Sequence, residues 1–195
     1  KGEFSNGLKT GIWETFNENG DIFSIGKYVN DYQNGNWKFF HNSGNLSLEG
    51  IFKNGYESGQ WISYYDGGEL DEIGEYINGL KDGKWGRFHV DGSLKQEETY
   101  KLGKLIEVSD FYLSDGNVFK NETFDNGNGE LFDYYEDGNI FSIAKYKNGL
   151  LNGMYSEYHT NGKISQSGMY KNGEKSGTWN EYNRRGRQIK RKTYD

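Results

Sequence analysis

Two similar stretches, FKNGYESGQWISYYDGG at residues 52–68 and YINGLKDGKWGRFHVDG at residues 76–92, decide the fold. They begin 24 residues apart and share an Asn-Gly pair, a tryptophan, a later aromatic residue and a closing glycine. A phrase that recurs at fixed spacing is typical of a structural unit that is stacked many times. The two stretches therefore indicate a repeat protein rather than a catalytic motif.

The period continues over the whole chain. Consecutive units begin 24 residues apart, except between Glu122 and Ala144, where the step is 22. The eight units begin at Gly2, Gly26, Gly50, Gly74, Glu98, Glu122, Ala144 and Gly168, and a partial ninth begins at Lys192. We therefore expect residues 1–195 to form a single repeat array, with residues 98–143 as its irregular part.

Aromatic columns accompany the period. The third position of every unit is aromatic, and all five tryptophans fall in a second column. The tryptophan column contains Trp13, Trp37, Trp61, Trp85 and Trp179, and the column three residues later contains Phe16, Phe40, Tyr64, Phe88, Tyr112, Tyr134, Tyr158 and Tyr182. These two rows are the candidate site residues. Either they pack on each other as the core, or one face stays exposed as a binding row.

Each unit is predicted to be one β-hairpin. In the third unit we expect strands at residues 45–53 and 59–65, joined by an NGxxxG loop at residues 54–59, because Asn and Gly tolerate the positive φ of such turns. Residues three apart in a regular strand face opposite ways, so either both faces carry aromatic residues or a bulge turns one row. The fold class is therefore all-β: a solenoid-like, elongated antiparallel sheet of about eight hairpin repeats.

Two further details follow from the hairpin pattern. The glycines that open most units lie inside a strand, where we expect a neighbouring aromatic ring to cover them. The two-residue deletion falls at DNGNGE, residues 125–130, and we expect it inside the hairpin loop, where it would not shift the strand pairing.

Composition limits the classes of partner. The net charge is −6, and an acidic protein is a poor ligand for nucleic acid or anionic lipid. The last residues are an exception, because Arg184, Arg185, Arg187, Lys190, Arg191 and Lys192 form a basic run. We expect no nucleic-acid partner, and contact with lipid only through this run.

The pattern Y-x-N-G-x-x-x-G-x-W-x-x-Y-x-x-D-G-x-L resembles the MORN-repeat family, and more closely its bacterial variant form. The resemblance covers nearly the whole chain and implies antiparallel hairpins laid side by side. Members of the family are described as scaffolds and membrane-junction proteins, or as a domain attached to a methyltransferase whose active site lies elsewhere. The bacterial variant form is often labelled an antitoxin or immunity-type protein.

The fifth unit departs from this pattern. It lacks the Asn-Gly pair, has Glu107 at the second loop glycine and has Ser109 at the tryptophan position. One interpretation is sequence drift at a tolerant place. The other is a bend, or a partner-specific acidic patch that includes Glu97, Glu98, Glu107 and Asp110.

No pattern of catalytic or metal-binding residues is found. The three histidines, His41, His89 and His159, occupy the same position in different units, so they would form a row and would not converge on one metal. The stretch DNGNGE lacks the spacing of a calcium loop. Adjacent carboxylates such as Asp71 and Glu72 would face opposite sides of a strand. We expect no catalytic residue, no metal and no cofactor.

Two functions are weighed on this basis. The first is a non-enzymatic scaffold that binds another protein, for which an antitoxin or immunity role is one form. The alternative is a cell-wall or glycan-binding module that uses exposed aromatic rows, although the W-Y-Y strings of choline-binding repeats are absent. An enzyme with a novel site ranks third.

The chain begins at Lys1, so we expect a preceding leader or segment to be missing. The localisation is therefore open between a bacterial cytoplasm and export.

Overall fold

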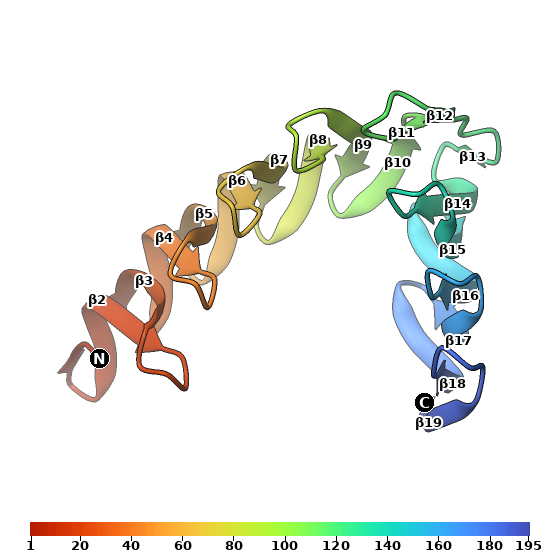
Figure 1. The fold of residues 1–195 in the computed structure, drawn as a ribbon. Helices are drawn as coiled ribbons and strands as arrows, with labels where there is room; N and C mark the ends of the chain where they lie inside the picture. The colour runs from red at the N-terminus through yellow and green to blue at the C-terminus, as the bar shows by residue number, and fades with distance from the viewer. The chain divides into compact units, whose positions relative to one another are not determined.

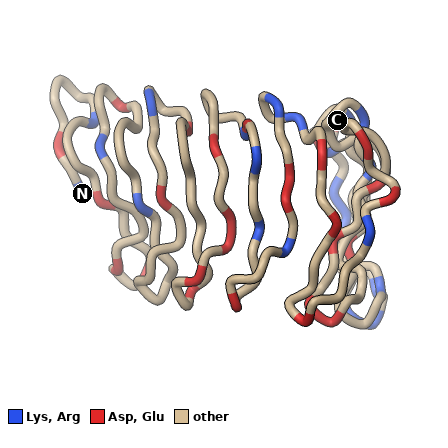
Figure 2. Tube along the Cα trace, turned by 90° about the horizontal axis from the view of Figure 1, so that it is seen from above, with Lys and Arg blue, Asp and Glu red and all other residues tan.

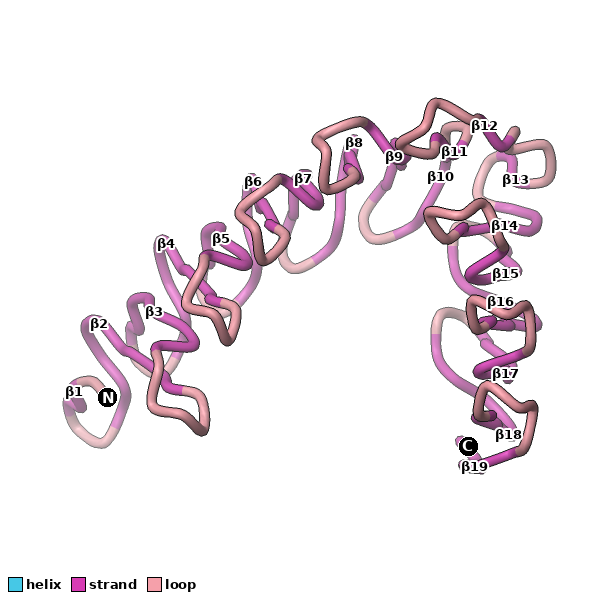
Figure 3. The backbone as a smooth tube through the Cα atoms, viewed as in Figure 1, coloured by secondary structure: helices cyan, strands magenta, loops and turns pink.

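A computed structural model describes all residues, Lys1–Asp195, and contains strands, turns and loops but no helix (Figures 1 and 3). The predicted all-β class of antiparallel hairpin repeats is confirmed. The structure has no helix that is long and apolar enough to span a membrane.

Contacts divide the chain into two compact units. Unit 1 comprises Lys1–Lys95 with Tyr100–Gly103, and unit 2 comprises Gln96–Thr99 with Lys104–Asp195. That residues 1–195 behave as a single array stays a prediction, and the two units are described separately.

Within each of the three sheets, every strand pairs with the next one in sequence. The first sheet has the order β1 to β10 without a crossover. Its strands are β1 (Glu3–Ser5), β2 (Leu8–Phe16), β3 (Ile22–Val29), β4 (Tyr32–Phe40), β5 (Leu46–Lys53), β6 (Tyr56–Tyr64), β7 (Leu70–Ile77), β8 (Leu80–Phe88), β9 (Leu94–Lys101) and β10 (Lys104–Val108). Successive antiparallel strands joined by short connections are what the 24-residue unit predicts.

The remaining strands belong to unit 2. A small sheet pairs β11 (Phe111–Tyr112) with β12 (Val118–Phe119). A seven-stranded sheet then has the order β13 to β19. Its strands are β13 (Phe124–Asp125), β14 (Asn128–Tyr134), β15 (Ile140–Lys147), β16 (Leu150–Tyr158), β17 (Ile164–Lys171), β18 (Glu174–Tyr182) and β19 (Gln188–Tyr194).

The connection within each hairpin is shorter than predicted. In the third unit it is the pair Asn54-Gly55, with φ of 52° and 85°, and β6 already begins at Tyr56. Two positive φ values in a two-residue loop define a type I′ turn, whose twist suits a hairpin. The expected NGxxxG loop is therefore wrong: only its first two residues form the turn.

The second glycine of that motif lies in a bulge of the return strand. Glu49 pairs with Ile62 and Ile51 pairs with Ser58, so Gly50 on β5 faces three residues on β6. One of these is Gly59, at φ 66°. A bulge that contains extra residues needs a backbone conformation that glycine adopts without strain.

The tryptophan of each regular hairpin covers the opening glycine, as predicted. A Cβ atom placed on Gly50 would lie 2.1 Å from the Trp61 ring, and the same holds for Gly74 and Trp85 at 2.0 Å. The Trp61 indole also donates a hydrogen bond of 3.2 Å from Nε1 to the carbonyl of Ile51. The bulge places the indole flat on the outgoing strand, and a side chain there would displace it.

The two-residue deletion lies in a strand, which corrects the prediction that it falls in the loop. The turn Asn126-Gly127 is intact, and Phe124 pairs with Gly129 in a ladder without extra residues. The deletion therefore removes the two additional residues of the bulge. Pairing with the following strand is kept, since Leu131 pairs with Ala144 just as Trp61 pairs with Gly74.

The fifth unit keeps its turn although it lacks Asn-Gly. Leu102 and Gly103 adopt φ of 48° and 78°, so the same two-residue turn is formed. Of the residues in the alternative acidic patch, Glu98 is buried and Asp110 pairs with Lys120 at 2.7 Å. A bend or a partner-specific role for this unit stays a hypothesis. The unit is irregular after Val108, where only the two-residue strands β11 and β12 are present.

Candidate binding surfaces

The tryptophan row forms the core on one face of the ten-stranded sheet, and Trp179 is buried in the seven-stranded sheet. Trp37, Trp61, Trp85 and Trp179 are only 2–3% exposed, and Trp13 is half-buried. Each ring packs edge-to-face against first-column aromatic residues, for example Trp61 against Phe52 at 4.9 Å and against Tyr76 at 6.0 Å between ring centres. Edge-to-face pairs add to the burial energy of each ring, so the row stabilises stacking of one hairpin on the next.

The later aromatic row lies on the opposite face in β6. The hydroxyl of Tyr64 donates a hydrogen bond of 3.0 Å to Glu49, and Glu49 pairs with Ile62 on the face away from Trp61. Both faces therefore carry aromatic residues, which answers the question that the three-residue spacing left open. Phe16 is 45% exposed, and the other members of the row are half-buried: Phe40, Tyr64, Phe88, Tyr112, Tyr134, Tyr158 and Tyr182. A binding role for either row stays a prediction.

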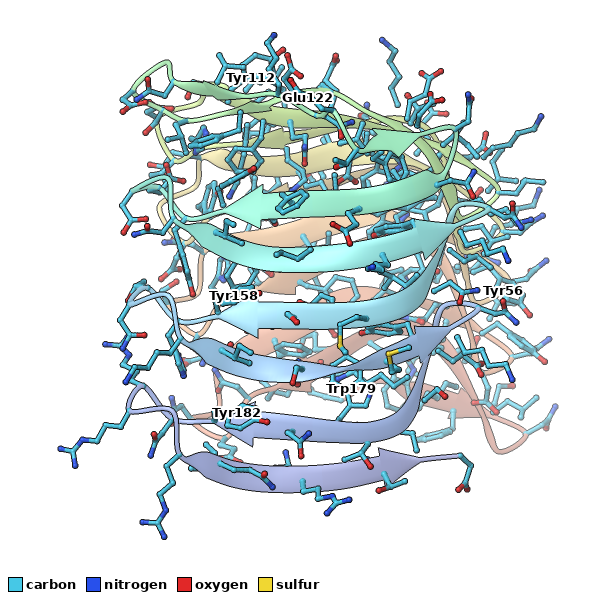
Figure 4. The ribbon with its side chains drawn as sticks, turned by 90° about the vertical axis from the view of Figure 1, so that its right-hand side faces the viewer. Tyr56, Tyr112, Glu122, Tyr158, Trp179 and Tyr182 are labelled. Carbon is cyan, nitrogen blue, oxygen red and sulfur yellow. The ribbon has the colours of Figure 1, made fainter.

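In unit 2 the same row recurs at strand ends. Tyr158 and Tyr182 lie at corresponding places at the ends of β16 and β18, while Trp179 lies within β18 (Figure 4). Tyr134 stacks on Phe119 with 4.2 Å between ring centres, so here the row packs against the irregular segment.

The histidines join neighbouring repeats. The Nε2–H groups of His41 and His159 donate hydrogen bonds of 2.9 Å to the carbonyls of Tyr64 and Tyr182, one repeat further on. Tyrosines at the same position do likewise, and Tyr135 donates a bond of 2.6 Å to the Tyr158 carbonyl. No group of three or more His, Asp or Glu side chains is placed to hold a metal ion. The column therefore has a structural function, which the sequence reasoning missed.

The hairpin turns of unit 1 carry an exposed apolar row that was also missed. Tyr32 is 60% exposed and Tyr56 is 59% exposed, each at the start of a return strand. We define the turn-edge row as Leu8, Val29, Tyr32, Tyr56, Ile77, Leu80 and Leu102, all of which are exposed. The sequence signal for this row is the apolar residue directly after the turn in four successive repeats. The interpretation of NGxxxG as a loop concealed it, because the residue then counts as part of the loop and not of a strand.

The turn-edge row is continuous from repeat to repeat. A Cβ on Gly55 would lie 3.3 Å from the Tyr32 ring, and a Cβ on Gly79 would lie 3.4 Å from the Tyr56 ring. Leu80 makes the same approach to Gly103, at 3.2 Å, so these three side chains each pack close to the glycine of the next turn. In unit 2 the residues at this position are Lys104, Asn128, Leu150 and Glu174, of which only the half-buried Leu150 is apolar, so the exposed apolar row belongs to unit 1.

Charged groups approach the tryptophan face of unit 1. Lys81 Nζ lies 3.9 Å from the centre of the Trp85 ring and donates a hydrogen bond of 2.6 Å to Glu72. Burial raises the pKa of the Tyr76 hydroxyl above its ordinary value, and the negative charges of Glu72 and Glu57 raise it further. This face is thus aromatic and locally acidic.

Comparison with protein families matches five segments to the MORN repeat variant. They are residues 9–30, 33–54, 57–78, 127–148 and 151–172, together more than half of the chain. The chain belongs to the MORN repeat variant family. Each matched MORN segment covers one return strand, the following outgoing strand and the first turn residue or residues. No match falls within residues 79–126, which include the irregular fifth unit.

Membership indicates the general class of function. MORN repeats are generally found in repeat proteins that have binding roles, and the family is typically non-enzymatic. The comparison with curated proteins found no match.

Proposed function

We propose that this MORN-variant protein is a non-enzymatic scaffold that binds another protein along the turn-edge row of unit 1. The observation that carries the proposal is the continuous row of exposed apolar side chains, with Tyr32 and Tyr56 about three-fifths exposed. A contiguous patch of solvent-exposed apolar side chains is typical of interaction sites, and tyrosine is enriched in binding hot spots.

The character of the row favours a protein over a glycan. Besides two tyrosines it contains Leu, Val and Ile side chains, which bury area against other apolar side chains but make no hydrogen bonds to sugar hydroxyls. Its members recur every 24 residues in neighbouring hairpins, which are about 10 Å apart. An extended protein segment or a flat protein surface can contact several members at once.

Outside the basic C-terminal run, the rest of the surface carries both signs of charge, so it attracts a partner of a single sign less strongly. Acidic and basic residues are distributed over strands and loops (Figure 2). In the basic C-terminal run, Lys190 pairs with Glu181 at 2.8 Å. Contact between that run and a lipid surface stays a prediction.

The test is capture followed by measured affinity. Proteins captured from a lysate of the source cell are identified, purified and titrated calorimetrically against the wild type and against Tyr32→Ser/Tyr56→Ser. We expect the variant to bind at least about tenfold more weakly, because two exposed anchors are lost. The matched control is Ile12→Ser/Ile51→Ser, which alters residues that are also exposed but lie within strands.

Two results would overturn the proposal. One is equal affinity of the wild type and the turn-edge variant for the identified partner. The other is saturable binding on a glycan array without any protein partner, which would support the wall-binding alternative. A captured toxin would assign the antitoxin or immunity role as the particular form of binding.

A further inference from the structure

The tryptophan face contains a recurring socket for a cation. Each regular tryptophan meets the first-column aromatic residue of the next repeat nearly at right angles, and we call the space between the two rings the wedge. In the first repeat, Trp13 and Tyr28 are 6.0 Å apart at 79°. In the fourth, Trp85 and Tyr100 are 6.5 Å apart at 77°.

Lysine ammonium groups of the chain itself occupy three of these wedges. Lys9 Nζ lies 4.8 Å from the centre of Trp13 and 4.9 Å from that of Tyr28. Lys81 lies 3.9 Å from Trp85 and 5.2 Å from Tyr100. The third is Lys175, at 3.9 Å from Trp179 and 5.9 Å from Tyr194. The geometry is that of a cation–π contact, in which the negative faces of the rings attract the positive charge.

The third repeat has the wedge but not the lysine. Trp61 and Tyr76 are 6.0 Å apart at 80°, nearly the same as in the first repeat. The position that is lysine in the first, fourth and eighth repeats is Glu57 here. A cavity of about 80 Å³ opens at this place, lined in part by Glu57, Trp61, Glu72 and Tyr76. The space that an ammonium group fills elsewhere is therefore available.

The charge at this wedge is the opposite of that in the three wedges that hold a lysine, and the second repeat has the neutral Gln33 at this position. The Glu57 carboxylate makes no hydrogen bond or ion pair within the chain, whereas Glu72 is bonded to Lys81. Two rings and an unpaired carboxylate thus converge on one cavity. A carboxylate beside ring faces attracts a cation and, in addition, accepts N–H hydrogen bonds from it.

We propose that the wedge of Trp61 and Tyr76, with Glu57 at its mouth, is a socket for a lysine side chain of the partner protein. The inference rests on the proposed function, because it names a contact within protein binding. Lysine is the occupant that the chain itself places in three equivalent wedges. A quaternary ammonium group lacks the N–H donors that the Glu57 carboxylate can accept, so it satisfies only the rings.

The socket can be tested without knowing the partner. The probe is Nα-acetyl-lysine-N-methylamide, titrated into the 15N-labelled protein while the indole N–H signals of the five tryptophans are followed. We expect the Trp61 signal to move in a saturable way while those of Trp13 and Trp179, whose wedges are filled, stay in place. The Nε-acetylated probe should have no effect, and the Nε-trimethylated probe should bind several-fold more weakly.

Variants locate the contact. Glu57→Gln should weaken probe binding about tenfold, since the charge-assisted hydrogen bond is lost. Glu57→Lys should abolish it, because the substitution supplies the occupant in place of the probe. Glu18→Gln is the matched control, since Glu18 is exposed in a loop of the first repeat of unit 1, and it should leave the probe affinity unchanged. An unmoved Trp61 signal, an equal response to the acetylated probe, or trimethyl-lysine binding as tightly as lysine would overturn the socket.

The two proposals fail in distinguishable ways. Should the socket be wrong and the scaffold function right, Glu57→Lys would bind the identified partner as tightly as the wild type. Should the scaffold function be wrong, no protein partner would depend on the turn-edge row, although the probe still shifted Trp61. We expect Glu57→Lys to lower partner affinity about tenfold while its far-ultraviolet spectrum matches that of the wild type.

Discussion

Every tryptophan in the chain lies on a glycine that has no room for a side chain. The pairs are Gly2 with Trp13, Gly26 with Trp37, Gly50 with Trp61, Gly74 with Trp85 and Gly168 with Trp179. Where the tryptophan is replaced, the glycine is replaced too: Glu98 accompanies Ser109, Glu122 accompanies Leu131, and Ala144 accompanies Tyr155. The two residues therefore form one packing unit, although 11 positions separate them in the sequence of a regular repeat.

The contribution of this glycine–tryptophan contact to the free energy of unfolding can be measured. Gly50→Ala would place a Cβ 2.1 Å from the Trp61 ring, so the ring must move from its buried position. We expect a loss of about 1–3 kcal/mol in the free energy of unfolding, measured by urea titration with tryptophan fluorescence.

The natural pair Ala144 and Tyr155 supplies the rescue. Gly50→Ala/Trp61→Tyr should lose less than the sum of the two single variants, because the smaller ring leaves space for the methyl group. Strict additivity in this double-mutant cycle would show that the close approach of glycine and ring is not what the alanine disturbs.

The Tyr155 hydroxyl makes the free energy of unfolding decrease at alkaline pH. Its burial raises the pKa of its hydroxyl far above the ordinary value, and the Glu157 charge and a 3.2 Å hydrogen bond to Glu157 raise it further. The folded state therefore holds this proton more tightly than the unfolded chain. Its contribution is fully present below about pH 10 and decreases as pH rises above that value, by up to about 1.4 kcal/mol per pH unit.

The variant Tyr155→Phe tests this dependence. It should lose about 1 kcal/mol at neutral pH and show a shallower decline of the unfolding free energy above about pH 10 than the wild type. Glu157→Gln should move the Tyr155 titration toward lower pH only in part, since burial is the larger cause. Parallel declines of wild type and Tyr155→Phe would contradict the assignment.

At the scale of the element, the sequence predicts the hairpins and misplaces their connections. Period-two alternation in LSLEGIFK gives β5 almost as the structure has it, Leu46–Lys53. The sequence pattern predicts that the return strand begins at Gly59, but it begins at Tyr56. A glycine at positive φ serves a loop and a bulge equally well, so the spacing between Gly55 and Gly59 does not distinguish them. The sheet face on which each aromatic row lies also depends on the position of the bulge, so it could not be predicted from the spacing.

The turn of the fifth unit carries strain that one substitution should relieve. Leu102 has φ of +48°, a conformation that leucine adopts at a cost and asparagine tolerates, and its side chain is 54% exposed. Leu102→Asn restores the Asn-Gly pair of the other units and should raise the unfolding free energy by about 0.5–1 kcal/mol, measured by urea titration. Leu80→Asn, at an exposed position within β8, is the control and should give no gain.

At the scale of the whole molecule, each hairpin depends on its nearest neighbours. Packing of this kind predicts that protection from hydrogen exchange varies along the chain. Within unit 1 we expect β4 to β7 to exchange most slowly, since they lie in the middle of the ten-stranded order and furthest from its ends, and β1 to exchange fastest. Within unit 2 the segment around β11 and β12 should exchange faster than β16, because their strands contain only two residues each.

Mass spectrometry of peptic fragments measures this profile. Equal protection of residues 109–123 and of β16 would show that the irregular segment is held by more than its short strands. Uniform protection along all strands of a unit would contradict nearest-neighbour stability and indicate that each unit opens as one body.

The hydrogen bonds between neighbouring repeats also determine how the protein responds to applied force. On one edge the Gly79 amide donates to the Glu57 carbonyl at 2.9 Å, and on the other His41 donates to the Tyr64 carbonyl at 2.9 Å. Both bonds reach only one hairpin further along, so tension applied at the termini loads the hairpins of a unit in series. Extension in an optical trap should then proceed in discrete steps, with each regular hairpin releasing at most about 86 Å of chain from its 24 residues.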